Sequence, residues 1–255
     1  MPIESKAYVV FGGASGLGHA TASTLAARGA MVMVSDLAPR GSEAVVSVDG
    51  GALAYSAADI ADEAQLRSVF RFATERFGRI DCVVNTAGVA HGEKLIGKAG
   101  AHAVASFERV IRINLIGTFN VLRLAAEVMA RNEADTDGER GVIVNTASIA
   151  AFDGQVGQTA YAASKAGVVG MTLPAARDLA RHGIRVVTLA PGLFNTPMVA
   201  GLPEEVKGAL ERLVPFPSRL GHPEEYAALV CHVLENRMLN GETIRLDGAL
   251  RMPPQ

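Results

Sequence analysis

Short apolar runs alternate with amphipathic stretches along the whole chain. The runs are apolar at nearly every position, which predicts buried strands at 7–11, 31–36, 52–57, 81–85, 141–148, 184–190 and 242–248. The stretches between them predict helices at 19–29, 62–78, 104–132, around Tyr161, and at 223–235. At 62–78 the apolar residues recur at helical spacing, and Asp62 with Gln65 three residues later predicts a capped helix start.

Strands that are apolar throughout and are separated by helices predict a parallel sheet covered on both faces. The expected fold is α/β, a Rossmann-like doubly wound sheet of about seven strands in a single domain that spans 1–255. No repeat or linker divides the chain. Two longer loops stand out, 91–103 and 192–222, and we expect the second to be a substrate-loop region with a short helical stretch of its own.

Composition narrows the range of partners. The chain has 255 residues, and its 24 basic and 26 acidic side chains give a formal charge of -2, which offers no electrostatic case for nucleic acid. No apolar run is long enough to span a bilayer, and the start of the chain resembles no targeting segment, so we expect a cytoplasmic protein. Cys82 and Cys231 lack the spacing of a zinc site; we expect two buried thiols and no metal.

A glycine-rich loop directly follows the first predicted strand and opens the first helix. It contains Gly12, Gly16 and Gly18, with Ser15 and Leu17 between them. A loop of this kind leaves room for a diphosphate at the helix N-terminus, where free N–H groups favour negative charge. The alternative is a glycine turn that serves only close packing.

Asp36 ends the second strand, about twenty residues after the glycine loop, as in dinucleotide-binding units. A carboxylate there accepts hydrogen bonds from both ribose hydroxyls of an adenosine and repels a 2′-phosphate. Leu37 follows, and Arg40 is interpreted as solvated, so we expect NAD rather than NADP. The alternative is that Asp36 only caps its loop.

Other polar or small residues follow the third and fourth strands. Since ligands bind at the carboxyl ends of parallel strands, we expect cofactor contacts there. The residues are Asp59, Ile60, Thr86, Ala87 and Gly88. Asp59 and Ile60 are expected to hold an adenine.

Ser148 ends the fifth strand, and Tyr161 and Lys165 are four residues apart on the next helix, so they share a face. A free phenol has a pKa of about 10, too high for a base at neutral pH, but a neighbouring ammonium favours the phenolate. Tyr161 then suits the exchange of a proton with an alcohol or ketone oxygen that Ser148 holds. Alone, the spacing also fits an ordinary solvated pair.

With these motifs together, the chain resembles the short-chain dehydrogenase/reductase family over essentially its whole length. The resemblance rests on the glycine loop, Asp59-Ile60, residues 85–88, Asn114, Ser148, the Tyr161–Lys165 pair, and Pro191-Gly192 with Thr196. It implies that Asn114 exposes a carbonyl to a water that relays the proton to Lys165. It further implies that Tyr161 and Lys165 contact the cofactor, and that Phe194 and Thr196 cover its nicotinamide.

Several runs, such as RVVTLAPGLFNTPM and NGETIRLDGALRMP, are similar to the type-2 3-hydroxyacyl-CoA dehydrogenase subfamily, also called 17β-hydroxysteroid dehydrogenase type 10. This implies interconversion of 3-hydroxyacyl-CoA and 3-oxoacyl-CoA with NAD in fatty acid metabolism by a homotetramer. The alternatives are a hydroxysteroid or other secondary-alcohol dehydrogenase, a 3-oxoacyl-thioester reductase that uses NADPH, and a non-catalytic scaffold.

Four features depart from the family pattern or are unassigned. Phe11 replaces the usual Thr before the glycine loop, so a hydroxyl bond between the first strand and a neighbouring turn should be missing. In the loop 91–103, Lys94, Lys98 and His102 either meet CoA phosphates or belong to a solvated loop. Gln155 is a candidate substrate contact beside Ser148 and Tyr161, or else a loop hydrogen bonder. Met198 and Leu202 either line a substrate lid or cover the core.

Overall fold

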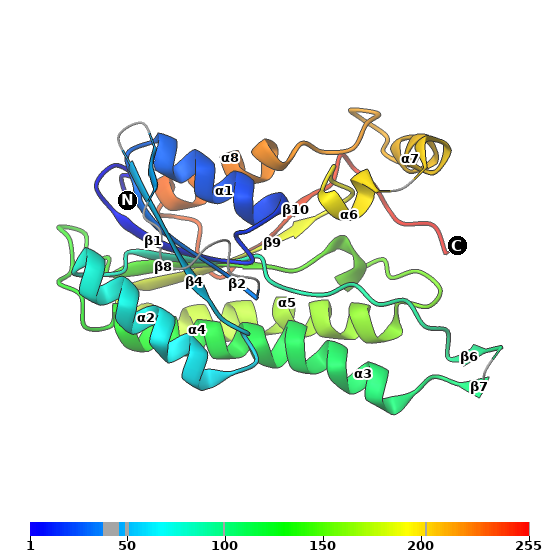
Figure 1. Cartoon of the computed structure of the whole chain (residues 1–255), viewed down its shortest axis with the longest axis horizontal. Coiled ribbons are helices and arrows are strands. Elements are labelled where there is room, and N and C mark those ends of the chain that lie inside the picture. Colours follow the sequence, from blue (N-terminus) through cyan, green and yellow to red (C-terminus); the bar gives the residue numbers. More distant parts are fainter. Residues whose placement is uncertain (38–45, 49–50, 99, 202, 255) are drawn as a thin grey trace.

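The computed structural model describes residues 1–37, 46–48, 51–98, 100–201 and 203–254. Figure 1 shows a central sheet between two layers of helices. In these residues the sheet has eight strands in the order β10-β9-β8-β5-β1-β2-β4-β3. Their bounds are β1 Ala7–Phe11, β2 Met31–Asp36, β3 Val46–Val48, β4 Gly51–Ala57, β5 Cys82–Asn85, β8 Gly141–Thr146, β9 Ile184–Pro191 and β10 Thr243–Leu246.

All neighbouring strands pair in parallel except β3, which pairs antiparallel with β4. The predicted Rossmann-like sheet of about seven parallel strands is therefore confirmed, and the short β3 is an addition. β1 lies between β2 and β5, so the strand order reverses at β1. In open α/β sheets the carboxyl ends of the strands at such a reversal form the ligand crevice.

Two helical layers cover the sheet. On one side lie α1 (Gly16–Ala27) and α8 (Pro223–Glu235); on the other lie α2 (Glu63–Phe77), α3 (Val104–Ile111), α4 (Thr118–Met129) and α5 (Thr159–Ala180) (Figure 1). Side chains alternate between the layers, because successive residues of a strand point to opposite faces. Val10 and Val32 pack towards α1 and α8, whereas Val9 and Met33 pack towards α2 and α4.

The start of α2 follows the predicted cap. The Asp62 carboxylate accepts hydrogen bonds from the backbone N–H groups of Ala64 and Gln65 at 2.9 and 3.1 Å. The Gln65 amide donates to Asp62 and accepts from the Asp59 N–H. The cap therefore also fixes the end of the turn that follows β4.

The long helix expected at 104–132 is interrupted. A π-helical segment, Arg112–Gly117, lies between α3 and α4. Gly117 packs directly against Ile60, where an added Cβ would lie 2.7 Å from the Ile60 side chain. The periodicity of apolar residues did not reveal this segment, because a π turn adds one residue without ending the helix.

The loops that were expected to carry function have local structure. The loop 91–103 contains a hairpin of β6 (Ile96–Gly97) and β7 (Gly100–Ala101), which extends away from the sheet (Figure 1). The region 192–222 contains two short helices, α6 (Pro197–Ala200) and α7 (Glu204–Glu211). Leu202, one of the two residues considered for a lid, is outside the described residues.

Two expectations from composition have a structural counterpart. Cys82 and Cys231 are both free and buried, as expected for packed thiols. Among the described helices, none combines the length and the apolar composition that crossing a bilayer requires.

Candidate active site

The glycine loop joins β1 to α1 at the carboxyl edge of the sheet. Gly12 and Gly16 have φ angles of 73° and 52°, in the left-handed region that glycine adopts without strain. A Cβ on Gly18 would lie 2.2 Å from the Gly12 carbonyl oxygen, so only glycine fits there. Ser15 is the N-cap residue of α1, but its side chain makes no capping hydrogen bond, and the first turn contains no acidic residue. The N–H groups at the start of α1 are therefore available to a ligand. The loop and these free N–H groups therefore fit a diphosphate.

Asp36 lies beside the loop. Its carboxylate accepts a hydrogen bond from the Ala14 N–H at 3.1 Å and from the Leu37 N–H at 2.7 Å. Its side chain is half-buried, so it remains accessible to a ligand that lies along the loop. Arg40, interpreted as solvated, is outside the described residues.

β1 is connected to the neighbouring turn although Phe11 has no hydroxyl. Its ring is buried and packs edge-on against Phe70, with the ring centroids 5.6 Å apart. Its carbonyl oxygen accepts hydrogen bonds from the Thr86 N–H at 2.9 Å and from Thr86 Oγ1 at 2.8 Å. Phe11 has no hydroxyl to bond the neighbouring turn. Thr86 in that turn instead donates its hydroxyl to the Phe11 carbonyl, so a hydroxyl bond still connects β1 to the turn.

The next two strand ends lie on either side of the crevice. Asp59 Oδ1 accepts from the Ala61 N–H at 2.8 Å, and the Ile60 side chain is buried against Gly117. A contact of Ile60 with adenine would therefore use its main chain rather than an apolar face. On the other side, a Cβ on Gly88 would lie 3.1 Å from Asn114 Oδ1 and 3.4 Å from Lys165 Nζ.

Ser148, Tyr161 and Lys165 meet at this edge, as the spacing predicted. Ser148 follows β8 and its Oγ accepts a hydrogen bond from the Ala150 N–H at 3.1 Å, which caps the 3-10 turn Ile149–Ala151. Burial raises the pKa of Tyr161, and a hydrogen bond to the Ser148 hydroxyl partly offsets that effect. The Lys165 ammonium lies 5.9 Å from the centroid of the Tyr161 ring.

Lys165 is almost fully buried. Its Nζ donates a hydrogen bond to the Thr146 carbonyl oxygen at 2.9 Å. Burial lowers the pKa of the ammonium to about 8. Sequence reasoning missed Thr146, since the contact uses a main-chain atom and carries no residue-type signal.

Asn114 lies in the π-helical segment and braces the turn that follows β5. Its side chain accepts from the Val89 N–H at 2.8 Å, and donates to the Val89 carbonyl at 2.9 Å and to Ser164 Oγ at 3.1 Å. Its own carbonyl oxygen accepts a hydrogen bond from Thr118 Oγ1 at 2.7 Å. A relay water would therefore use the second lone pair of that oxygen.

The segment after β9 closes the site from the side of α1. Gly192 packs against Asp247, and Thr196, at the start of α6, lies beside the position of a Cβ on Gly16. The Phe194 ring is buried against Gly221. In this structure Phe194 therefore offers little surface to a nicotinamide, whereas Thr196 borders the glycine loop.

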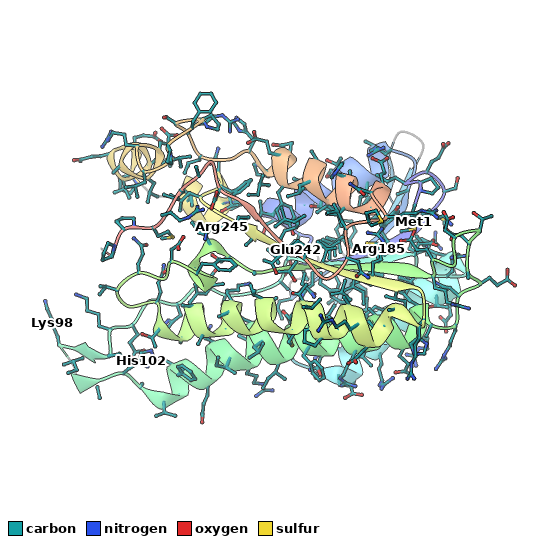
Figure 2. The ribbon with its side chains drawn as sticks, turned by 180° about the vertical axis from the view of Figure 1, so that it is seen from behind. Met1, Lys98, His102, Arg185, Glu242 and Arg245 are labelled. Atoms are coloured by element: carbon teal, nitrogen blue, oxygen red, sulfur yellow. The ribbon has the colours of Figure 1, made fainter. Side chains whose placement is uncertain are left out.

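Two of the four candidates for substrate contacts have other partners, and the other two are exposed. The Gln155 amide donates to the Pro253 carbonyl at 3.2 Å. The His102 ring is only 9% exposed and lies 3.8 Å from Glu93 in the base of the hairpin. Lys94 is exposed, and so is Lys98, which extends from the tip of the hairpin in Figure 2. Among the described residues, no group of three or more His, Cys, Asp or Glu side chains is arranged to hold a metal ion.

A doubly wound parallel sheet with a glycine-rich strand-to-helix turn and a Ser, Tyr and Lys cluster at its carboxyl edge defines a Rossmann-like oxidoreductase. Residues 6–207 match the family model described as short chain dehydrogenase. The chain belongs to the short-chain dehydrogenase family.

Relatives extend this likeness over the full length. The chain is 54% identical to 3-hydroxyacyl-CoA dehydrogenase type-2 of Drosophila melanogaster, over 99% of this chain and 100% of that protein. It is also 54% identical to the Homo sapiens protein of the same name, over 99% and 97% of the two chains. The crystal structure of 3-hydroxyacyl-CoA dehydrogenase type-2 from Mycobacterium avium superposes with a TM-score of 0.89 at 37% identity and covers both chains fully.

Proposed function

We propose that the protein is an NAD-dependent dehydrogenase that interconverts 3-hydroxyacyl-CoA and 3-oxoacyl-CoA. The observation that carries the proposal is the full-length likeness to 3-hydroxyacyl-CoA dehydrogenases type-2 in a chain whose Ser148, Tyr161 and Lys165 converge. The place of this reaction in fatty acid metabolism is part of the same proposal.

Tyr161 is the group that exchanges a proton with the substrate oxygen. In the direction of oxidation its phenolate takes the proton of the 3-hydroxyl, and in reduction its phenol returns a proton to the developing alkoxide. The Ser148 hydroxyl donates to the same oxygen and stabilises its charge. NAD, when bound, supplies the acceptor or donor of the hydride at the carbinol carbon.

Lys165 and Asn114 support Tyr161 without touching the reacting carbon. The Lys165 ammonium favours the phenolate because an opposite charge nearby lowers the pKa of an acid. Its Nζ donates a hydrogen bond to the Thr146 carbonyl. Lys165 Nζ also lies close to Gly88, in the turn that Asn114 braces. We therefore assign Lys165 to the charge and Asn114 to the geometry of the relay.

The preference for NAD is supported by Asp36. A carboxylate held beside the glycine loop accepts the ribose hydroxyls of NAD and repels the 2′-phosphate of NADP. This argues against the NADPH-dependent thioester reductase that the sequence left open. Contacts of Gly12, Ser15, Leu17, Asp59, Thr86, Ala87 and Pro191 with the cofactor are part of the proposal.

The second candidate is a dehydrogenase of steroids or of other secondary alcohols, since an acyl chain and a flat sterol both require an apolar pocket. A non-catalytic scaffold is the weaker alternative, because a chain without activity has no need to retain Asn114, Ser148, Tyr161 and Lys165 together.

The homotetramer is likewise proposed rather than observed. Support comes from large apolar side chains that are exposed on α3, the π-helical segment and α4, namely Val104, Phe107, Ile116 and Phe119. Exposed apolar patches of this kind mark protein interfaces. The cytoplasmic location that the sequence predicts is part of the proposal and rests on the sequence alone.

The test is the consumption of NADH by the purified protein with acetoacetyl-CoA, with NADPH and a 17-ketosteroid in parallel reactions. Fast turnover of the thioester with NADH supports the proposal. Turnover of the steroid alone would withdraw the substrate class and keep the mechanism. Turnover of neither ketone, in a protein that still binds NADH, would favour the scaffold.

A further inference from the structure

A continuous series of buried hydrogen bonds crosses the sheet next to the site, and it starts at a tyrosine that the mechanism does not use. The hydroxyl of Tyr226, on α8, lies 2.7 Å from Thr146 Oγ1. Thr146 Oγ1 in turn donates to the Asn85 carbonyl oxygen at 2.7 Å. Because a threonine hydroxyl has a single hydrogen, Tyr226 is the donor in its bond with Thr146.

The same series continues on the other face of the sheet. Asn85 Nδ2 donates to Thr118 Oγ1 at 3.1 Å, and Thr118 Oγ1 donates to the Asn114 carbonyl at 2.7 Å. Thr146 thus contacts Tyr226 through its hydroxyl and Lys165 through its carbonyl. Each of the residues in this series, Tyr226, Thr146, Asn85, Thr118, Asn114 and Lys165, is buried.

We propose that Tyr226 is a positioning residue, whose hydroxyl holds the end of β8 so that the Thr146 carbonyl fixes the Lys165 ammonium next to Tyr161. The proposal rests on the proposed function in so far as Lys165 acts there. It assigns a role in the site to α8, a helix that lies on the opposite side of the sheet from α5.

Lys165 depends on this carbonyl because little else stabilises its charge. A buried ammonium is costly unless it is hydrogen-bonded, and burial is the cause that lowers its pKa to about 8. Among the described residues, the groups around it are the Tyr161 ring, the Thr146 carbonyl and the Asn114 amide oxygen, which lies beside Gly88 as Lys165 Nζ does. None of these is a carboxylate, so the carbonyl is the acceptor that favours the charged form.

A purely structural role for Tyr226 would need only its ring. The residue is fully buried in the core cluster beneath α8, where a phenylalanine ring would pack in the same way. Among the described residues, Thr146 is the partner of its hydroxyl. The hydroxyl therefore has a specific target, and that target holds Lys165.

The test compares Tyr226→Phe with Tyr8→Phe. Tyr8 is an equally buried tyrosine of the same core cluster, and within the described part of the chain its hydroxyl contacts only the Pro2 and Ile3 carbonyls, at 3.5 Å. For each variant we would measure kcat and KM for alcohol oxidation as a function of pH. The titration of Lys165, followed by NMR of protein with isotope-labelled lysine, gives a readout that needs no turnover.

For Tyr226→Phe we expect the Lys165 ammonium to lose its proton at a pH lower by about half a unit, since a weakened acceptor favours the charged form less. A less firmly held ammonium also favours the Tyr161 phenolate less, so the pKa of Tyr161 should rise by about half a unit. The acidic limb of kcat for oxidation should then move to higher pH, and kcat at neutral pH should fall by about threefold, the change that half a pKa unit corresponds to. KM should change little. Tyr8→Phe should shift neither curve.

Thr146 supplies the second pair of variants. Thr146→Ser retains the hydroxyl and should keep both curves near those of the wild type. Thr146→Val removes it together with its bond to the Asn85 carbonyl, and should shift both curves at least as far as Tyr226→Phe. The double variant should be no worse than Thr146→Val alone, because the Tyr226 hydroxyl acts through Thr146.

Equal Lys165 titrations in Tyr226→Phe and Tyr8→Phe would overturn the proposal even if Tyr226→Phe melts at a lower temperature. So would additive effects of the Tyr226 and Thr146 changes. A wild-type protein that turns over no ketone would reject the proposed function, whereas the NMR titration would still decide the role of Tyr226.

Discussion

At the scale of single residues, the chemistry of the site depends on opposed effects on one phenol. Burial raises the pKa of Tyr161, whereas the Ser148 hydroxyl lowers it. Lys165 lies close enough to favour the phenolate, but its own pKa is lowered to about 8 by burial. The acid–base behaviour of the site therefore belongs to these three groups together.

Tyr161→Phe should lose nearly all turnover, because the phenyl ring cannot exchange a proton with the substrate oxygen. General acid–base groups contribute about 10²–10⁴-fold to a rate, and we expect a loss in this range. NADH binding, followed by the change in its fluorescence, should be retained. Turnover close to that of the wild type would remove Tyr161 from its assigned role.

The two directions of the reaction should respond to pH with opposite signs. Oxidation needs the phenolate, so its kcat should rise with pH as Tyr161 loses its proton, and burial places that rise on the alkaline side of neutrality. Reduction needs the phenol and should slow as pH increases. Measuring kcat in both directions over the same buffers checks this. An oxidation rate that falls with pH would contradict it.

Asp36→Ala should narrow the preference for NAD over NADP. The change removes the carboxylate that lies beside the glycine loop and repels a 2′-phosphate. The measurement is the ratio of kcat/KM for the two cofactors with one substrate. Asp59→Ala, a carboxylate after the next strand, serves as the control, and an unchanged ratio in Asp36→Ala would exclude Asp36 as the discriminating group.

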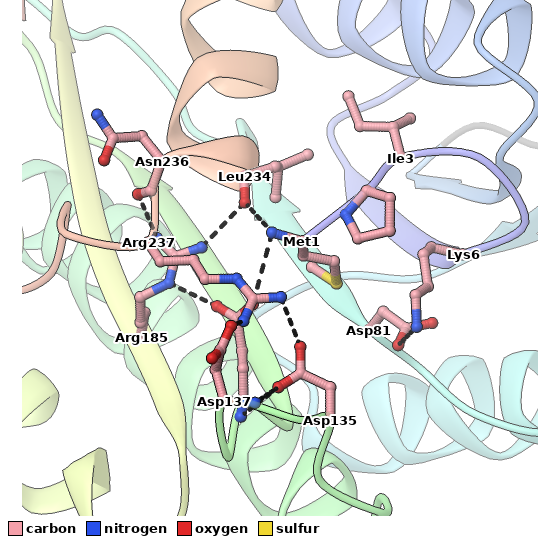
Figure 3. Close-up of polar contacts among 12 residues, drawn as sticks. Met1, Ile3, Lys6, Asp81, Asp135, Asp137, Arg185, Leu234, Asn236 and Arg237 are labelled. Atoms are coloured by element: carbon pink, nitrogen blue, oxygen red, sulfur yellow. Dashed lines mark hydrogen bonds and ion pairs between the residues drawn. The ribbon is translucent and has the colours of Figure 1, made fainter.

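At the scale of elements, the carboxyl end of α8 is held by a buried arginine. Arg185, near the start of β9, donates to the carbonyls of Val233, Leu234 and Leu239 at 2.9, 3.1 and 2.8 Å. Its Nε donates to the buried Glu139 carboxylate at 2.6 Å. Figure 3 shows Arg185 among Leu234, Asn236 and Arg237, with Asp135 and Asp137 on the opposite side of Arg237.

Arg185→Met should destabilise the protein by about 3 kcal/mol. The buried Glu139 carboxylate loses its hydrogen-bond donor and keeps only the Met1 ammonium and Arg237 at 3.6 and 3.7 Å, and the carbonyls of Val233, Leu234 and Leu239 lose theirs. Denaturant unfolding at one fixed protein concentration measures the change. Arg67→Met is the matched control, since Arg67 pairs with Glu63 and Glu127 on the exposed surface of α2 and α4. An equal loss in both variants would mean that the buried pair adds nothing specific.

At the scale of the whole molecule, the apolar face of α3 and α4 has no covering element among the described residues. If it is the interface of the proposed tetramer, Phe119→Glu should reduce the oligomer to smaller species, because burying an unpaired carboxylate is costly. Analytical ultracentrifugation measures the result. Met238, which is 90% exposed, provides Met238→Glu as a control that should leave the oligomer intact. A wild-type monomer would reject the tetramer.

Local patterns in the sequence determined a large part of this protein. A strand that is buried on both faces needs apolar residues at nearly every position, so the apolar runs predicted the seven parallel strands. The glycine loop and the Asp62 cap depend on contacts between near neighbours in the chain, and the Tyr161–Lys165 pair depends on the helix repeat. Each of these can be read from residues a few positions apart.

Tertiary structure alone decided the rest. The π-helical segment depends on how Gly117 and Asn114 pack against Ile60 and Val89, which are distant in sequence. Thr86, 75 positions from Phe11 in the chain, supplies a hydroxyl bond to the Phe11 carbonyl that the side chain of Phe11 cannot make. Thr146 and Tyr226 are 80 positions apart, and nothing local marks either residue. Such contacts join main-chain atoms and hydroxyls of ordinary residue types, so only the folded chain brings them together.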